Sequence, residues 1–284
     1  MFEQFIKELQ YLKNLSPLTI KSYRQAYGRY CQYSGENDIL PTKTSLNQFV
    51  IGMREAGLKP TSCNISIRAI NSYLSWLHEN ELVKERLRIK QLKAERKVIE
   101  PYTDEELHKV LSFKPKDFYE WRLYALASLL IDTGCRIQEV LTLKTSGLDL
   151  DNQLLRIKGK GSKERIVPFS FELRKLLVLY LKKRLDKRGD YVFCATTGNR
   201  LSYRNILRDW EAFCRRLSIP YRPFHQLRHN FGLNFIREGG DISELRRLLG
   251  HSSITTTQLY VNLQTEDLKR AHQRTSILSR LKGS

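Results

Sequence analysis

The sequence predicts a mainly α-helical protein of two domains, the first all-helical and the second mixed α/β, mostly helical with a small antiparallel sheet. Its 284 residues are enough for two domains of ordinary size. Apolar residues recur at helical spacing through most of the chain, and one glycine-rich turn joins two segments typical of strands. A charged stretch without an apolar stripe, residues 89–101, is predicted to link domain 1–88 to domain 102–284.

The first domain is predicted to contain only helices. Ser16-Pro17 is typical of a helix start, because Ser caps free N–H groups and Pro fits the first turn. Apolar and aromatic side chains then recur three or four residues apart in three stretches. These are Ile20, Tyr23, Tyr27 and Tyr30; Leu46, Phe49, Val50 and Met53; and Ile67, Ile70, Leu74 and Leu77.

The second domain is predicted to open with a helix at Thr103. Thr103 and Glu106 form a capping box, in which each side chain bonds the backbone N–H of the other. A strongly apolar helix over residues 121–131 follows, and it stops at Thr133-Gly134, where glycine can adopt the backbone conformation of a helix end.

A β-hairpin is predicted next. LLRIK (154–158) and ERIVPF (164–169) are rich in β-branched or alternating side chains, and the glycines of GKGSK between them suit the turn. Helices are predicted again from about Phe171, with breaks near Gly189–Gly198 and Pro220–Pro223.

The chain is strongly basic, with 49 Lys and Arg against 30 Asp and Glu and a net charge of +19. Residues 1–100 carry 16 basic and 10 acidic side chains, and the remainder carries 33 and 20. Positive charge in both domains suits a nucleic acid whose phosphates run along both. The alternative is a basic protein with no specific partner.

Other features of the composition indicate a soluble cytoplasmic protein. The sequence has no apolar run of about 18 residues that would span a membrane, and its charged N-terminus does not resemble a signal peptide. Five cysteines, an odd number without a C-x-x-C pair, argue against a disulfide framework or a structural zinc site. We therefore expect buried free thiols and no membrane partner.

Five segments of the second domain carry groups suited to phosphate chemistry. They are TGCRIQEVLTL (133–143), KGKGSKERIVPF (158–169), HQLRH (225–229), LLGHSS (248–253) and TTTQLYVNL (255–263).

Two of these segments present a cation at a turn or a helix start. Arg136 follows Gly134 and can clamp two phosphate oxygens with its planar guanidinium, or it can form a surface ion pair with Glu139, three residues on. Lys160 at the tip of the hairpin can donate a proton to a leaving oxygen, or it can be a solvated turn lysine.

The HQLRH segment has three interpretations. His225 and Arg228 share a helix face, so that one can move a proton while the other holds a phosphate oxygen. A metal site would need a third ligand at matching spacing, which the sequence lacks, so no metal is expected. A histidine satisfied within the core is the remaining alternative.

His251 follows a predicted helix end, and Tyr260 comes nine residues later. A tyrosine between Leu259 and Val261 is commonly a core residue. As a nucleophile its phenol, with an ordinary pKa of about 10, needs cations nearby to ease loss of the proton.

Taken in order, these side chains resemble the catalytic set of the tyrosine recombinases, the phage integrase family. TGCRIQEVLTL, KGKGSKERIVP, HQLRHNF and LLGHSSITTTQLY resemble the four signature boxes of the family, and SPLTIKSYRQAYGRYC with TSCNISIRAINSYLSWL resembles its SAM-like core-binding domain. The resemblance covers nearly the whole chain and is closest to Xer-type and transposon-encoded integrases. Gln226 and Asn230 replace an expected Asp and Thr, and Cys135 replaces a larger apolar residue. The six matching catalytic positions are Arg136, Lys160, His225, Arg228, His251 and Tyr260.

The resemblance implies a site-specific DNA recombinase that acts through a 3′-phosphotyrosine intermediate, in integration, excision, transposition or dimer resolution, without a cofactor. Tyr260 would attack the phosphodiester, the two arginines would neutralise its oxygens, and Lys160 would protonate the departing 5′-oxygen. His225 would serve as acid or base, His251 would bond the phosphate, and Glu139 would orient nearby cations. The alternatives are a type IB topoisomerase-like DNA relaxing enzyme and a non-catalytic DNA-binding regulator.

The resemblance further implies double-stranded DNA with paired recombination sites as the partner, a homo-tetramer on that DNA, accessory DNA-binding proteins and a nucleoid location. The tail TEDLKRAHQRTSILSRL (265–281) is expected to dock on a neighbouring protomer, the alternative being a tail folded on its own domain. The expected DNA contacts, for which solvated charge is the alternative, are Lys21, Tyr23, Arg24, Asn64, Arg68, Lys163, Arg165 and Arg204.

Overall fold

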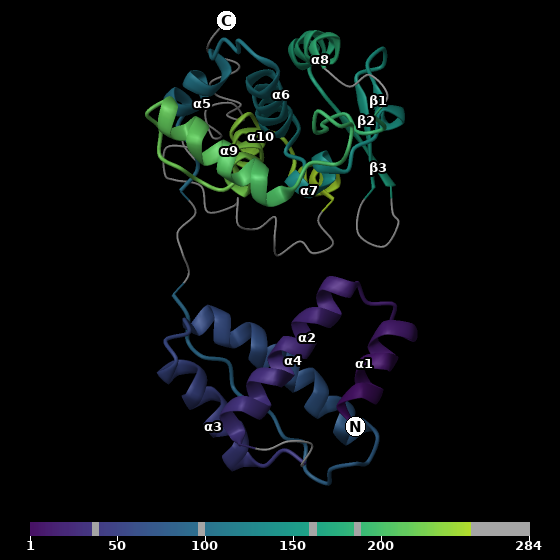
Figure 1. Cartoon of the computed structure of the whole chain (residues 1–284), viewed down its shortest axis with the longest axis vertical. Coiled ribbons are helices and arrows are strands. Elements are labelled where there is room, and N and C mark those ends of the chain that lie inside the picture. The colour runs from purple at the N-terminus through teal and green to yellow at the C-terminus, as the bar shows by residue number, and fades with distance from the viewer. Residues whose placement is uncertain (36–39, 96–99, 159–163, 185–188, 251–284) are drawn as a thin grey trace, which may run out of the picture. The chain divides into compact units, whose positions relative to one another are not determined.

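In the computed structural model the chain forms two compact units, Met1–Val98 and Ile99–Ser284. Figure 1 shows their elements in the colours of the sequence. The residues that the structure describes are 1–35, 40–95, 100–158, 164–184 and 189–250.

The first unit is all-helical, as the sequence predicts, and its described residues form four helices around an apolar core (Figure 1). Ser16 caps the second helix by accepting a hydrogen bond from the Thr19 N–H at 3.3 Å, with Pro17 in the first turn. Aromatic rings join the first two helices, because Phe2 stacks on Tyr27 with ring centroids 3.7 Å apart. The helices are α1 (Phe2–Tyr11), α2 (Pro17–Ser34), α3 (Lys43–Glu55) and α4 (Pro60–Glu79).

The first part of the predicted linker belongs to the first unit. Residues 89–92 pack on the first unit, where Ile89 is 8% exposed and joins the core of the helices. Side chains of α4 hold this segment in place by bonding its backbone.

The second unit is mostly helical with one three-stranded antiparallel sheet, as predicted. The capping box of Thr103 and Glu106 is present, and the apolar helix ends at Thr133 with Gly134 in the left-handed conformation at φ +62°. This helix runs through the core, packed against both α8 (Phe171–Lys183) and α10 (His225–Arg237) (Figure 1). The helices are α5 (Asp104–Leu111), α6 (Phe118–Thr133), α7 (Ile137–Leu141), α8 (Phe171–Lys183), α9 (Tyr203–Arg216), α10 (His225–Arg237) and α11 (Ile242–Leu249).

The predicted hairpin pairs β2 (Leu154–Lys158) with β3 (Glu164–Pro168), and a two-residue strand, β1 (Leu148–Asp149), extends the sheet in the order β1-β2-β3. The sequence analysis missed β1, because two residues are too few for an alternating pattern. Arg165 lies opposite Ile157 in this register, on the same face of β3 as the buried Val167.

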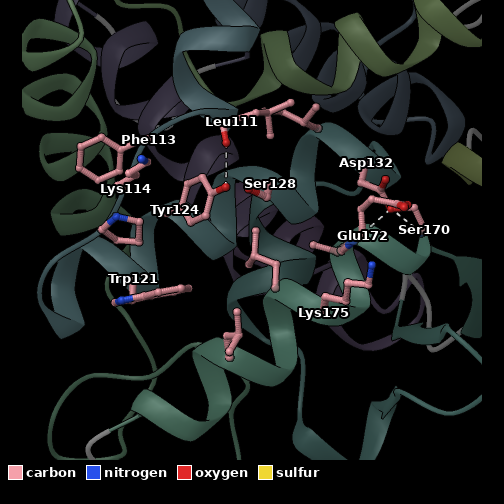
Figure 2. Close-up of a pocket in the computed structure, with 15 residues that line it drawn as sticks. Leu111, Phe113, Lys114, Trp121, Tyr124, Ser128, Asp132, Ser170, Glu172 and Lys175 are labelled. Atoms are coloured by element: carbon pink, nitrogen blue, oxygen red, sulfur yellow. Dashed lines mark hydrogen bonds between the residues drawn. The ribbon is translucent and has the colours of Figure 1, made fainter.

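A groove of about 640 Å³ lies between α6 and α8 (Figure 2). Its walls are largely apolar, with Trp121 and Leu176 among the lining residues. On one side the Tyr124 hydroxyl donates to the Leu111 carbonyl oxygen at 2.8 Å, which joins the end of α5 to α6.

All five cysteines are free thiols, and four of them are buried, which confirms that prediction except at the partly exposed Cys31. No helix among the described residues has both the length and the apolar character that crossing a membrane requires.

Candidate active site

Arg136 stands at the start of α7, directly after the turn that ends α6. The turn is tight, because a Cβ on Gly134 would approach Phe231 to 2.5 Å and Leu249 to 2.9 Å. The absence of a side chain at Gly134 therefore lets the chain pass between α10 and α11 and delivers Arg136 to the end of α11.

Arg228 reaches the same place from inside α10. Its side chain is buried, at 2% exposure, and donates from Nη1 to the Gly134 carbonyl oxygen and from Nη2 to the Leu249 carbonyl oxygen, both at 2.8 Å. A buried guanidinium needs acceptors for its N–H groups, and here backbone carbonyl oxygens supply them.

The two arginines converge on one acceptor. Arg136 donates from Nη1 to the Leu249 carbonyl oxygen and from Nη2 to that of Gly250, each at 3.4 Å. These carbonyls stand at the C-terminal end of α11, where the helix dipole presents partial negative charge. Two guanidinium groups from segments some ninety residues apart are thus gathered at one helix end.

Glu139 ties a third arginine into this group. Arg165 donates to both carboxylate oxygens of Glu139 at 2.8 Å, and its Nε donates to the Leu248 carbonyl oxygen at 3.1 Å. The ion pair of Arg136 with Glu139, foreseen as the alternative, is also present, with Nη1 at 3.1 Å from Oε1. Arg136 therefore meets both the helix end and the carboxylate.

The Glu139 carboxylate is charged although its side chain is only 8% exposed. Burial by itself would raise the pKa of Glu139, but the hydrogen bonds from Arg165 and from the Arg136 backbone N–H outweigh burial and lower it below the ordinary value. The expectation that Glu139 orients neighbouring cations agrees with these contacts.

Arg165 was expected to contact DNA, yet its side chain is only 15% exposed and its guanidinium is turned to Glu139. The sequence contained a signal for this. In the alternating pattern of β3, Arg165 and Val167 share a face, and Val167 belongs to the core.

His225 and His229 lie one turn apart at the start of α10, with ring centroids 5.3 Å apart. Partial burial lowers the pKa of His225 below 6.5, and the positive charges of Arg228 and Arg136 lower it further. Burial, His225 and Arg228 lower the pKa of His229 to about 4. Both imidazoles are therefore neutral at pH 7, and His225 lies within electrostatic range of Arg228 and Arg136.

Two of the three departures from the family pattern, Asn230 and Gln226, have different surroundings. Asn230 bonds the backbone of Tyr102 twice, accepting from its N–H at 2.9 Å and donating to its carbonyl oxygen at 2.6 Å, which fastens the start of the unit to α10. Gln226 has a buried Oε1 without a hydrogen-bond partner among the described residues.

Of the six predicted catalytic residues, the structure brings together Arg136, Arg228 and His225. The other three, Lys160, His251 and Tyr260, lie outside the described residues, as do Lys163 and the tail 265–281. Within the part of the chain that is described, no three His, Cys, Asp or Glu side chains are grouped as a metal ion would need.

The remaining predicted DNA contacts differ in their surroundings. Arg24 is paired with both carboxylate oxygens of Glu3, and Tyr23 packs against Phe5. Asn64 is 8% exposed and bonds the backbone of another segment. The exposed side chains among them are Lys21, Arg24, Arg68 and Arg204.

Two arginines that meet at one helix end, with a third paired to the adjacent Glu139 carboxylate, suit a protein that holds a phosphate group, and comparison with known proteins identifies its family. The profile of the phage integrase family matches residues 100–267, and that of the phage integrase N-terminal SAM-like domain matches residues 2–81. The chain therefore belongs to the phage integrase family.

The relatives that it resembles are Xer recombinases. The chain is 31% identical to the tyrosine recombinase XerA of Thermococcus kodakarensis over 96% of its own length and 94% of that protein. It is 28% identical to XerC of Shewanella amazonensis, covering 99% and 97%. The resemblance of the sequence to Xer-type tyrosine recombinases is thus confirmed.

Solved structures share the fold. The XerH recombinase bound to palindromic difH substrate superposes with a TM-score of 0.75 at 22% identity, covering 95% of this chain and 83% of that one. The Tn1549 transposon integrase in complex with transposon right end DNA gives 0.72 at 18% identity, covering 96% and 98%. The function of this family is site-specific DNA recombination by a tyrosine-type enzyme, and neither the topoisomerase-like alternative nor the non-catalytic regulator is favoured.

Proposed function

We propose that the chain cleaves and rejoins DNA strands with Tyr260 as the nucleophile and with Arg136 and Arg228 as the clamp of the scissile phosphate. Tyr260 would displace the 5′-oxygen and form a 3′-phosphotyrosine bond, and the freed 5′-hydroxyl of the partner strand would later reverse that step. The energy of the broken bond is kept in the phosphotyrosine, so strand exchange needs no nucleotide hydrolysis.

The observation that carries this proposal is the convergence of two guanidinium groups on the Leu249 carbonyl oxygen. A phosphate oxygen is a stronger acceptor than a neutral carbonyl, because charge-assisted hydrogen bonds are about twice as strong as neutral ones. The 3.4 Å contacts of Arg136 are long for hydrogen bonds. Its guanidinium can therefore exchange them for phosphate oxygens at little loss.

The other roles that we propose follow from proton movement. As the phosphorus gains a fifth bond, negative charge builds on its oxygens, and the arginines stabilise it. His225 is neutral at pH 7 and near both arginines, so it can accept the phenolic proton of Tyr260. Lys160 would protonate the departing 5′-oxygen, and His251 would donate a hydrogen bond to the phosphate.

The test is covalent trapping on a suicide substrate, a duplex nicked so that cleavage releases a short strand and cannot be reversed. The wild type should give a complex that survives denaturant, and Tyr260→Phe should give none. Tyr119→Phe, at a tyrosine 59% exposed on α6, is the matched control and should trap normally. A covalent complex formed by Tyr260→Phe would refute the assignment of the nucleophile.

We further propose double-stranded DNA with paired sites as the partner, four protomers in the active assembly, and accessory DNA-binding proteins at the sites. The DNA complexes among the structural neighbours support the DNA partner. Such an enzyme would be found with the nucleoid.

The tail supports a proposal about assembly. With its apolar residues Leu268, Ala271, Ile277 and Leu281, it can form a helix that docks on a neighbouring protomer. Deleting residues 265–284 should spare binding to one half-site and weaken cooperative filling of two. Deleting only residues 282–284 keeps those four residues and should leave cooperativity intact. Equal cooperativity in the two deletions would contradict trans docking.

A further inference from the structure

The segment after α4 is fastened to that helix by two asparagine side chains. Asn71 donates from Nδ2 to the Ile89 carbonyl oxygen at 2.9 Å and accepts from the Ile89 N–H at 2.8 Å. Asn64 makes the same pair of bonds with Leu92, both at 2.8 Å. Each amide bonds one residue through both of its backbone groups, as a neighbouring strand would. The two asparagines therefore fix the course of residues 89–92 on the first unit.

The fastened segment alternates in character. Leu87 and Ile89 pack against the core of the first unit, while Arg86, Arg88 and Lys90 are exposed. Alternation is what an extended chain produces, because successive side chains point to opposite sides. Holding the backbone at Ile89 therefore sets the direction of the cations beside it.

A polar groove of about 590 Å³ runs between this segment and α4. We call it the arginine groove, because three arginines line it together with other polar side chains. Among its lining residues are Arg68, Arg86, Arg88, Ser72, Ser75 and Gln91. None of the described residues that line it is acidic. The nearby carboxylate of Glu85 is engaged by Lys43 at 3.1 Å.

We propose that the arginine groove binds the phosphodiester backbone of duplex DNA, and that Asn64 and Asn71 are positioning residues for it. This rests on the proposed function, since a recombinase must hold the duplex beside the cleavage point while strands are exchanged. Guanidinium forks match phosphate oxygens, and serine hydroxyl and glutamine amide groups add neutral donors. The groove offers donors on two walls, one from the helix and one from the segment.

Salt dependence of binding to a single half-site tests the groove. Each phosphate contact contributes about 0.9 to the slope of log affinity against log salt concentration. Arg86→Ala with Arg88→Ala should therefore lower that slope by about 1.8 and weaken binding roughly equally on specific and unrelated duplexes. Lys7→Ala with Lys13→Ala removes the same charge near α1 and is the control. An unchanged slope in the arginine variant, or an equal fall in the control, would overturn the proposal.

The asparagines are tested by a variant that keeps every basic side chain. Asn64→Ala with Asn71→Ala should lower the salt slope toward that of the arginine variant, and the Ile89 and Leu92 amides should exchange faster with solvent. A slope that stays at the wild-type value while those amides lose protection would show that the asparagines have only a structural role.

Failure of this inference is distinguishable from failure of the proposed function. Both experiments measure binding under conditions that need no cleavage, and the Tyr260→Phe protein can be used throughout. Covalent trapping by the wild type depends on residues of the second unit, so it tests the proposed function separately from the arginine groove.

Discussion

Removing the Arg165 guanidinium leaves the buried Glu139 carboxylate without its main charged partner, and the structure indicates how much stability is lost. Glu139 is 8% exposed and receives two hydrogen bonds of 2.8 Å from Arg165. Breaking a buried pair by deleting one partner destabilises a protein by about 3–5 kcal/mol. Because Arg136 still bonds Glu139 through its backbone N–H at 2.8 Å and its Nη1 at 3.1 Å, we take the lower end of that range for Arg165→Gln.

The assay is thermal unfolding followed by circular dichroism. For a domain of this size, 1 kcal/mol corresponds to about 2–4 °C, so a loss of about 3 kcal/mol lowers the Tm by about 6–12 °C. Glu139→Gln in the Arg165→Gln background removes the unpaired charge and should recover part of the loss. Arg204→Gln, at an exposed arginine of α9, is the control and should shift the Tm by less than about 2 °C.

The pH dependence has a definite sign. The pKa of Glu139 is lowered in the folded protein, so its pairing contributes stability above the ordinary carboxyl pKa, and that contribution is lost as pH falls through the folded value. In the Arg165→Gln variant the Arg165 guanidinium no longer offsets the effect of burial, so the pKa of Glu139 rises. The difference in Tm between the Arg165→Gln variant and the wild type should therefore shrink as pH falls from about 7.5 to about 4. A difference that is independent of pH, or no recovery in the double variant, would refute the reasoning.

Three further predictions concern the same unit. Arg136→Ala and Arg228→Ala should each slow single-turnover cleavage at least about 100-fold and change half-site affinity only a few-fold, because most of the +19 charge remains; a loss confined to affinity would contradict this. His229 should titrate near pH 4 by NMR, and since its pKa is lowered in the folded state, stability should fall as pH drops from about 6.5 toward 4; a midpoint near 6.5 would show an exposed imidazole. Asn230→Ala should remove both bonds to Tyr102, lower the Tm by about 4–8 °C and speed proteolysis near residue 100; unchanged cleavage there would argue against the fastening role.

Local signals in the sequence were sufficient for the main elements. The cap at Ser16, the capping box at Thr103 and the stop at Gly134 each depend on neighbours within four residues, and each is where it was predicted. The same holds for the hairpin, whose strands are specified by alternation and by the turn between them.

Contacts between distant residues could not be predicted in this way. Nothing near Asn64 in the sequence indicates that its amide bonds Leu92, 28 residues away, so its polarity suggested a DNA contact. Likewise the positive charge of Arg165 suggested a phosphate, whereas its partner Glu139 lies 26 residues earlier. Charge and polarity identify a side chain that needs a partner, and only the fold determines which partner it has.

The last turn of α11 restricts how this enzyme can diverge. Its three final carbonyls, from Leu248 to Gly250, each receive an arginine, and Gly250 has φ +63° with Arg165 atoms 3.0 Å from where a Cβ would stand. A mutation that shifts this short helix by a fraction of an ångström perturbs all three guanidinium groups together, although the helix carries none of them. Variation in target-site preference is therefore expected on surfaces remote from α11, while substitutions at the fully buried Leu245 or Leu249 are expected to impair cleavage as substitutions of the arginines themselves would.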